Sequence, residues 1–399
     1  MILPHLSLRS VLLPGLLSLA ATAAHAQDQH TITTAVPILT ISPDSRSGAL
    51  GEAGVAISPD ANAGYHNPGK LGFVRYQHSA SLSYTPWLAS ITNDMGLGYL
   101  SGTTKLSDRS TLSANLMYFD LGAIEYRDFL GNSNGGFNPK EYAVTIGYGQ
   151  KLSDKFGVGL NVRYVRSNLT GNGGDVTPGN AVAVDLGAYY TTDLTIGAGD
   201  YNLAFGGAVS NIGNKITYTD PRNADFLPTN LKLGTAITKE LDPFNKLTFT
   251  FDANKLLVPS PYYEEGPDAN TNASIAAVRA ENDKRRAYGI VKGITSSFSD
   301  APGGFSEELQ EINLSAGLEY AYNDLLMVRA GYFYENPTKG NRQYLSFGAG
   351  VRYQVFGVDG TYLVPNSKAN PLAETLRVSL HFNFNELSEA FGPSDSPVN

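Results

Sequence analysis

Few residues of this chain have the types and spacings that catalysis or metal binding requires. Its 399 residues include no cysteine, which excludes a thiolate nucleophile, a thiolate metal site and a disulfide. No histidine pair has the H-E-x-x-H spacing of zinc proteases, and no G-x-x-x-x-G-K-[ST] phosphate loop is present. Asp268, Asn270 and Asn272 begin like a calcium-binding loop, but the Gly and Glu that complete one are missing. We therefore expect no catalytic residue, no metal site and no cofactor.

A larger set of charged residues lies inside stretches whose polarity alternates from one residue to the next. In residues 246–254, Thr250 and Asp252 share one face, and Phe249 and Phe251 share the other. This alternation is typical of a β-strand with one apolar face. The charged residues on the polar faces are Asp185, Arg163, Lys232, Asp252, Glu319, Arg329, Arg352 and Arg377. Charges of both signs on one face can pair with each other or hold an inserted segment, and structural pairing is a commoner use than ligand binding.

The same two-residue period recurs through most of the chain after residue 75. The stretches that show it are residues 76–89, 95–107, 110–128, 141–153, 155–169, 180–192, 200–212, 229–241, 245–258, 311–323, 325–336, 342–354, 355–366 and 374–384. Most are much longer than the average sandwich strand of about five or six residues. Short turns such as 107–109 alternate with longer connections, of which 259–310 is the longest.

These patterns predict an all-β fold, a 14-stranded antiparallel transmembrane β-barrel. An even strand number, with short turns at one end and longer loops at the other, is typical of outer-membrane barrels. A soluble barrel or sandwich fits less well, because 14 strands would enclose a lumen too wide for small polar side chains to fill. Even parity predicts that both ends of the chain lie in the periplasm with the short turns.

The N-terminal residues predict export. Residues 1–26 contain Arg9, an apolar stretch and an A-x-A cleavage site at Ala24–Ala26, the features of a secretory signal peptide. The predicted domains are therefore a signal peptide (1–26), a hatch or plug (27–75), the barrel (76–384) and a periplasmic tail (385–399). A net charge of −8 argues against nucleic acid as a partner.

Residues 47–71 have a different composition from the strands that follow. Their glycines let backbone approach backbone closely and adopt positive φ angles. Asp60 has the position of an N-cap before a short helical turn, and Asn67-Pro68-Gly69 has turn chemistry. We expect the segment to plug the barrel from the periplasmic side. The residues that shape this plug are Gly48, Gly51, Gly54, Asp60, Asn67 and Pro68.

The strand predicted over residues 110–128 contains a local conflict. Leu116 and Tyr118 belong to its outward row, and the same phase would place Asp120 and Gly122 in lipid. A carboxylate there is costly, although the cost falls near the membrane interfaces. Either Asp120 lies near an interface, or a bulge or kink at 120–122 turns the side chain away. The second arrangement would weaken the wall and allow lateral exit or the docking of a partner.

The longest connection, residues 259–310, is a candidate recognition loop. Loops of this length are usually functional or disordered, and simple surface decoration is the alternative. The loop opens with a Pro- and Tyr-rich run, carries a basic cluster at 284–286, and shows helical spacing around 281–298. The candidate residues for contact with cargo or a partner are Tyr262, Tyr263, Arg285, Arg286, Phe298 and Phe305.

The glycine-rich segment and its flanks resemble a known family. Gly48-x-x-Gly51-x-x-Gly54, followed by Asp60-Ala61 and Asn67-Pro68-Gly69-x-Leu71, is similar to the N-terminal hatch of FadL-type outer-membrane proteins. Within that group the chain resembles the PorV (LptO) family of the type IX secretion system through Val36–Arg46, Trp87-Leu88 and Tyr118–Ile124. The hatch motif is common to FadL-like proteins, and the flanking segments favour PorV.

The resemblance implies a non-enzymatic protein of the cell outer membrane. PorV-like proteins bind the C-terminal signal domain of secreted cargo and shuttle it from the translocon barrel (SprA or Sov) to the surface attachment complex, which contains the sortase-like PorU. The resemblance implies these same partners here, together with outer-membrane lipid. Two alternatives are FadL-like transport of hydrophobic small molecules and an enzyme acting on lipid A. The second is suggested only by the family's other name.

Overall fold

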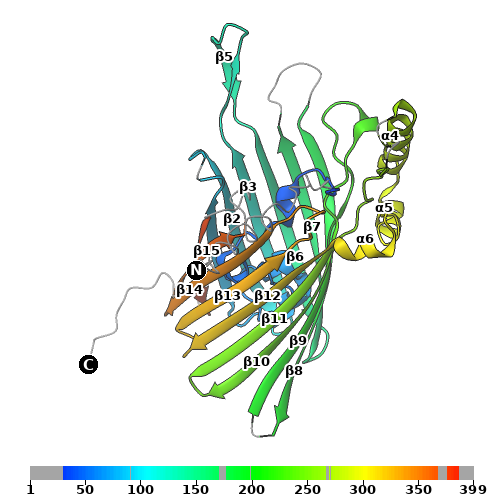
Figure 1. The fold of residues 1–399 in the computed structure, drawn as a ribbon. Coiled ribbons are helices and arrows are strands. Elements are labelled where there is room, and N and C mark those ends of the chain that lie inside the picture. Colours follow the sequence, from blue (N-terminus) through cyan, green and yellow to red (C-terminus); the bar gives the residue numbers. More distant parts are fainter. Residues whose placement is uncertain are drawn as a thin grey trace, which may run out of the picture.

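The computed structural model of the chain describes residues 30–89, 91–169, 177–197, 199–266, 269, 271–366 and 375–385. The predicted signal peptide, the tail after residue 385, and Asp268 and Asn270 lie outside these residues. The described part forms a closed antiparallel barrel around an N-terminal segment, with a small two-stranded sheet and three helices at one end (Figure 1). Among these residues, no helix combines the length and the apolar character needed to cross a membrane.

The barrel has 14 strands, as the sequence predicts. They are β1 (His78–Pro86), β2 (Met95–Ser107), β3 (Ser110–Leu121), β6 (Lys140–Lys151), β7 (Phe156–Asn168), β8 (Gly179–Ile196), β9 (Gly199–Gly213), β10 (Asn230–Asp242), β11 (Asn245–Leu256), β12 (Ile312–Tyr322), β13 (Leu326–Tyr334), β14 (Gln343–Tyr353), β15 (Phe356–Pro365) and β16 (Leu376–Phe384). Each pairs antiparallel with the next, and β1 pairs with β16 from His78↔Phe384 to Tyr84↔Val378. Closure leaves the sheet without an exposed edge.

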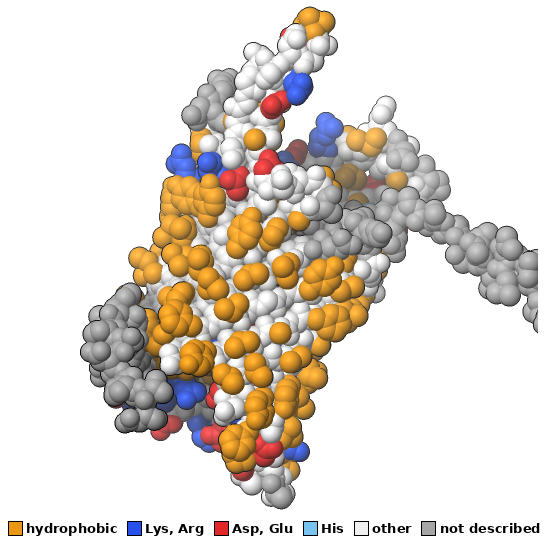
Figure 2. All heavy atoms as spheres, turned by 90° about the vertical axis from the view of Figure 1, so that its left-hand side faces the viewer, with side chains coloured by type: hydrophobic (Ala, Val, Ile, Leu, Met, Phe, Trp, Pro, Cys, Tyr) orange, Lys and Arg blue, Asp and Glu red, His pale blue; other side chains and the backbone are white. Residues whose placement is uncertain are grey.

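The two-residue period places apolar side chains outside the barrel and small or polar ones inside. On β11, Phe249 and Phe251 are 49% and 37% exposed, whereas Thr250 and Asp252 are buried. The outward side chains form a broad apolar belt over the strands, and charged side chains gather beyond its two ends (Figure 2). Lipid requires such a belt of a barrel's outer face, so the alternation that predicts the strands also explains the membrane location.

The two ends of the barrel differ in their connections. Tight turns such as 107–110, 242–245 and 353–356 lie at one end, here called the short-turn end. The other, the long-loop end, carries the longer connections. The connection between β11 and β12 holds α4 (Asn272–Arg286), α5 (Ile290–Ser296) and α6 (Phe305–Gln310), and that between β9 and β10 holds η3 (Pro221–Asn223). Helices α4 to α6 stand outside the barrel wall, beside the upper part of the strands (Figure 1).

The predicted strand 110–128 is wrong beyond residue 121. β3 ends at Leu121, Gly122 has a φ of 80°, and the chain then forms a separate sheet of β4 (Ile124–Arg127) and β5 (Ser133–Phe137). This hairpin projects beyond the barrel's rim (Figure 1). Both sheets have the same two-residue period, so the sequence pattern does not show where one ends and the other begins.

Residues 30–75 thread the lumen from the long-loop end to the short-turn end. At the first end, the backbone N–H of His30 donates to the carbonyl of Thr338 in the β13–β14 loop, at 2.8 Å. At the other, Arg75 lies 3.6 Å from Asp324 in the tight β12–β13 turn. Between them lie η1 (Pro37–Thr40), α2 (Ser45–Ala49), α3 (Ala63–His66) and η2 (Pro68–Phe73).

This course bears on the prediction that both ends of the chain lie beside the short turns. His30, the first described residue, lies at the long-loop end. Residues 1–29 and the tail after residue 385 lie outside the described part, so the position of the termini themselves stays a prediction. Strand parity fixes the positions of the barrel's own ends, and β1 and β16 do meet at the short-turn end through His78 and Phe384. Parity says nothing about the course of a segment that fills the lumen.

Candidate functional site

Two predicted plug glycines lie so close to neighbouring atoms that there is no room for a side chain. Gly51 has a φ of 66°, and a Cβ there would lie 2.4 Å from the carbonyl oxygen of Tyr332 on β13. A Cβ on Gly54 would lie 2.3 Å from Nδ1 of His66. At these two positions a larger residue would collide with its neighbours, and at Gly51 it would also strain the backbone.

Asn67 and Pro68 press the plug against β7 and β8. The side chain of Asn67 accepts from the N–H of Gly69 at 2.9 Å and donates to the carbonyl oxygen of Ala188 at 2.9 Å. A Cβ at Gly159 would lie 2.1 Å from the carbonyl oxygen of Pro68, so the wall needs a glycine at this point. The turn therefore fits directly into the wall and fills the lumen toward the short-turn end.

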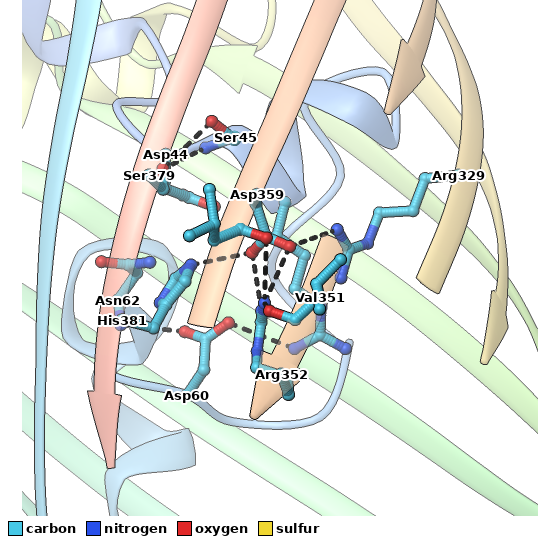
Figure 3. Close-up of polar contacts among 12 residues, drawn as sticks. Asp44, Ser45, Asp60, Asn62, Arg329, Val351, Arg352, Asp359, Ser379 and His381 are labelled. Atoms are coloured by element: carbon cyan, nitrogen blue, oxygen red, sulfur yellow. Dashed lines mark hydrogen bonds and ion pairs between the residues drawn. The ribbon is translucent and has the colours of Figure 1, made fainter. Parts of the chain in front are cut away.

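Buried ion pairs join the plug to the wall. Arg46 of α2 donates to the two carboxylate oxygens of Glu319 on β12, at 3.0 and 2.9 Å. Arg329 links Glu319 (2.6 Å) to Asp359 on β15 (2.9 Å), and Arg352 also reaches Asp359. Figure 3 shows the side chains of Arg329 and Arg352 pointing toward Asp359 from nearby strands. Of the charges predicted on the polar faces, Glu319 and Arg329 therefore pair with each other, as Arg163 and Asp185 do at 2.7 Å. Glu319 also holds the plug through Arg46.

Asp60 and Gly48, two further predicted plug residues, each lie beside a buried arginine. Asp60 accepts from Arg46 at 3.1 Å and from the backbone N–H of Asn62 at 2.8 Å. The prediction that Asp60 is a helix N-cap is wrong, because the N-cap of α3 is Asn62. Gly48 lies against the guanidinium of Arg377 on β16, where a Cβ would be 2.8 Å from Nη1.

Three plug residues look like a catalytic triad but cannot act as one. His66 Nε2 lies 2.9 Å from Ser47 Oγ and 2.6 Å from Asp44 Oδ2. A serine triad needs its two partners on different ring nitrogens, so that the carboxylate orients the ring while the other nitrogen takes the hydroxyl proton. All three side chains are also buried. In the part of the chain that the structure describes, no cluster of three or more His, Asp or Glu could hold a metal ion.

A chamber of about 550 Å³ remains between the N-terminal segment and the wall at the long-loop end. Its apolar side is lined by Trp87, Phe119, Leu121, Leu169 and Leu256. On its polar side Lys339 lies 3.0 Å from Glu311, and Arg342 lies 2.7 Å from Glu335. Because these charges neutralise one another, the chamber offers mainly apolar contact to a ligand.

Three of the predicted contact residues in the α4–α6 loop bind the loop to itself. Arg285 donates to the carbonyl oxygen of Ser260 at 2.7 Å, and its guanidinium lies over the ring of Tyr262. Tyr263 donates to Glu307 at 3.0 Å. Burial and the Glu307 carboxylate raise the pKa of the Tyr263 hydroxyl. These side chains give the loop a defined shape.

The other three predicted loop residues are more exposed. Arg286 lies 3.6 Å from Asp225 in the β9–β10 loop, with 45% of its side chain exposed. Phe298 is 51% exposed and Phe305 is 76% exposed. These two phenylalanines remain available to a partner or to lipid.

The β4–β5 hairpin presents a second apolar surface, its tip. Phe129 is 98% exposed and Leu130 is 74% exposed. The following run, Gly131–Gly135, matches G-x-S-x-G around Ser133. Ser133 belongs to an exposed two-stranded sheet, whereas a nucleophile elbow needs a turn from a strand into a helix. Ser133 therefore lacks the geometry of a nucleophile elbow, and the tip is an exposed apolar surface.

Asp120 and Gly122 lie where β3 ends. The Asp120 carboxylate folds back and accepts from the N–H of Gly122 at 3.0 Å. β3 stays paired with β2 as far as Met95↔Leu121 and with β6 as far as Asp120↔Lys140. The wall formed by these described strands is therefore continuous at the point where we considered a side exit.

A family comparison covers most of the chain. The model described as "Type IX secretion system protein PorV" matches residues 24–263, more than half of the sequence. The chain belongs to the PorV family. Membership makes it an outer-membrane protein of the type IX secretion system, which interacts with secretion machinery and cargo. PorV-family barrels are non-enzymatic transport proteins.

Solved structures show only low similarity to this PorV-family chain. The toluene transporter TodX of Pseudomonas putida is 12% identical, with 88% of this chain and 98% of that chain covered and a TM-score of 0.47. A FadL homologue of Pseudomonas aeruginosa is 11% identical, with 90% and 100% covered and a TM-score of 0.45. Similarity at this level does not indicate what the chain binds. No curated protein matches it.

Sequence reasoning missed two features of this PorV-family barrel. Lys255 lies 2.8 Å from Glu308 and 2.7 Å from Glu311, residues more than 50 positions away, and no local pattern signals that contact. The hairpin tip does have a signal in the sequence, since Phe129 and Leu130 are adjacent large apolar residues followed by a run of Gly, Asn and Ser.

Proposed function

We propose that this protein binds the C-terminal signal domain of secreted cargo at its long-loop end. It then shuttles the cargo from the translocon barrel (SprA or Sov) to the surface attachment complex that contains the sortase-like PorU. The PorV-family match over residues 24–263 is the observation that carries the proposal. Arg46 pairs with Glu319, and Asp252 accepts from the plug backbone, so the plug is fixed to the wall inside the barrel. Because the plug occupies the lumen, a folded cargo domain has to bind on the outside.

Two elements at the long-loop end supply the contact surface. They are the β4–β5 hairpin tip, with Phe129 and Leu130, and the part of the α4–α6 loop that precedes α6. Aromatic side chains are enriched at the centres of protein interfaces, where they bury a large area. The internal contacts of Arg285 and Tyr263 keep the loop in shape before cargo arrives, which lowers the ordering cost of binding.

A pull-down with a purified cargo signal domain tests this proposal. One variant lacks residues 262–305, which leaves Glu308 and Glu311 in place to pair with Lys255. A second carries Phe129→Ser and Leu130→Ser. We expect each to bind cargo at least about tenfold more weakly, equivalent to about 1.4 kcal/mol. Unchanged cargo binding by both variants would contradict the proposal that cargo binds at the long-loop end.

The partner assignments need a separate experiment. Affinity purification of the tagged full chain from the native membrane, followed by protein identification, should recover a translocon barrel and a sortase. Recovery of neither would contradict the shuttle.

The chamber at the long-loop end favours one alternative, FadL-like transport of hydrophobic small molecules. Trp87, the chain's single tryptophan, lines this chamber, so its fluorescence reports on an occupant. Titration with an aromatic hydrocarbon should shift the emission if the chamber binds such ligands. Transport further requires a path past Asn67 and Pro68, which are buried against the wall. Binding without flux into vesicles would limit the alternative to a ligand site.

A further inference from the structure

Lys255 occupies an unexpected position on the barrel wall. On β11 it has the same phase as Phe249 and Phe251, which face lipid, so its side chain points outward. Its neighbours in the same row are Leu231 on β10 and Ile312 on β12. A lysine on the lipid face of a barrel is unfavourable unless it lies near an interface or is covered. Lys255 is covered, being only 8% exposed.

The cover is α6, which stands outside the wall (Figure 1). The ammonium of Lys255 lies 2.8 Å from the carboxylate of Glu308 in α6 and 2.7 Å from that of Glu311, which follows the helix. Glu307, also in α6, pairs with Lys339 of the β13–β14 loop. The helix thus turns its glutamates toward the barrel, and Glu307 and Glu308 are each only 5% exposed.

The opposite face of α6 is apolar and exposed. Phe305 and Leu309 are four residues apart, so they share one face of the helix. They are 76% and 52% exposed. The same loop also exposes Val291 of α5 (75%) and Phe298 just after it (51%). A helix whose outer face meets water is expected to place its glutamates on that face and its apolar residues against the barrel.

We propose that the outer face of α6, with Phe305 and Leu309, lies in the lipid leaflet on the long-loop side of the membrane. The helix neutralises the outward charge of Lys255 and presents apolar side chains to lipid in its place, so the apolar belt of the barrel continues over it. The occupant of this face is therefore the acyl region of the bilayer near its interface and not the cargo. Partly buried apolar faces of this kind bind membranes in proportion to their buried area.

Depth-dependent quenching tests this inference. The chain has no cysteine, so Phe305→Cys and Leu309→Cys can each carry a single bimane label in the full-length protein. The labelled proteins are reconstituted in phosphatidylcholine vesicles with or without nitroxide-labelled lipid. We expect nitroxide lipid to quench both labels at least about twofold more than a label at Phe129→Cys on the hairpin tip. A label at Phe249→Cys, on the barrel's belt, gives the upper limit.

Two results would overturn the inference. One is equal quenching at residues 305 and 129, with equal access of aqueous iodide to both. The other is a loss of lipid quenching at 305 when the cargo signal domain is added, which would make α6 a cargo face. Cargo binding measured in the same vesicles keeps this test separate from the proposed function, because cargo can bind whether or not α6 lies in lipid.

Discussion

Inside the barrel, charged side chains of the plug find partners on the wall, whereas at the long-loop end large apolar side chains extend away from the molecule. Arg46 and Arg329 share Glu319 in the lumen, while Phe129 at the hairpin tip is 98% exposed. Breaking a buried pair leaves an uncompensated charge, but removing an exposed apolar side chain costs the fold almost nothing. The contrast indicates that the lumen holds the plug in place, and it supports the proposal that the long-loop end makes the contacts with cargo.

The largest effect on stability should come from Glu319→Gln. The change leaves Arg46 and Arg329 without their shared carboxylate, and breaking a buried pair in this way costs roughly 3–5 kcal/mol. Denaturant unfolding in lipid vesicles, followed by the fluorescence of Trp87, measures the loss. Glu240→Gln, at an exposed position on β10, is the control and should change stability by less than about 0.5 kcal/mol. Equal stability of the two variants would mean that the ion pairs do not hold the plug.

A comparable effect is expected from Gly51→Val. The new Cβ would lie 2.4 Å from the carbonyl oxygen of Tyr332, and the φ of 66° disfavours any branched residue. Overpacking and the positive φ each cost about 1–3 kcal/mol. We expect a destabilised or unplugged barrel, detected as dye efflux from vesicles. The matched control is Gly360→Val on β15, where a Cβ would meet nothing within 4 Å. Normal folding of Gly51→Val without added efflux would contradict the account.

Acid should loosen the long-loop end through Glu307. Burial raises the pKa of this carboxyl, but the Lys339 ammonium and the N–H of Gly303 outweigh it, so the pKa lies below the ordinary value of 4.5. A carboxylate with a lowered pKa stabilises the fold above its unfolded value and loses that contribution as the pH falls. We therefore expect proteolysis of the α4–α6 loop to accelerate below about pH 4.5.

Glu307→Gln is the control for this pH dependence. The variant should already be more sensitive to protease at pH 7, and its cleavage rate should change less between pH 7 and pH 4 than that of the unchanged chain. The same acceleration in both proteins would assign the acid response to other groups.

The smallest effect on stability should come from the hairpin tip. Phe129→Ser with Leu130→Ser changes two exposed side chains, so unfolding should shift by less than about 0.5 kcal/mol per residue. Cargo binding should fall all the same. Normal stability with weakened cargo binding would separate the tip from Gly51, whose replacement by valine should lower stability. A variant that loses stability instead would show that the tip packs on something within the chain.

The sequence predicts the barrel well because each strand carries its own evidence. Phe249 and Phe251 alternate with Thr250 and Asp252, and a lipid-facing wall makes that local pattern obligatory. The plug residues are predicted as a group for a similar reason, since Gly51 and Asn67 signal close backbone approach and a turn. The local chemistry at these positions is sufficient to predict that the segment packs closely and turns.

The features that the sequence does not predict depend on contacts between residues far apart in the chain. Arg46 and Glu319 are 273 positions apart, and no periodicity in the sequence indicates their contact. The same holds for α6, whose inverted amphipathic face becomes clear only once Lys255 is seen to point outward beneath it. The end of β3 at Leu121 was missed because the hairpin continues the strand period.

A reversible lock on the plug tests the central claim most directly. Ser45 of α2 and Ser379 of β16 have their hydroxyl oxygens 3.1 Å apart, so Ser45→Cys with Ser379→Cys can join plug to wall in a chain that has no other cysteine. Cargo secretion is then measured in cells with the bond oxidised and reduced. If recognition lies at the long-loop end and the plug stays closed, secretion is the same in both states. Secretion that stops on oxidation and returns on reduction would contradict the account.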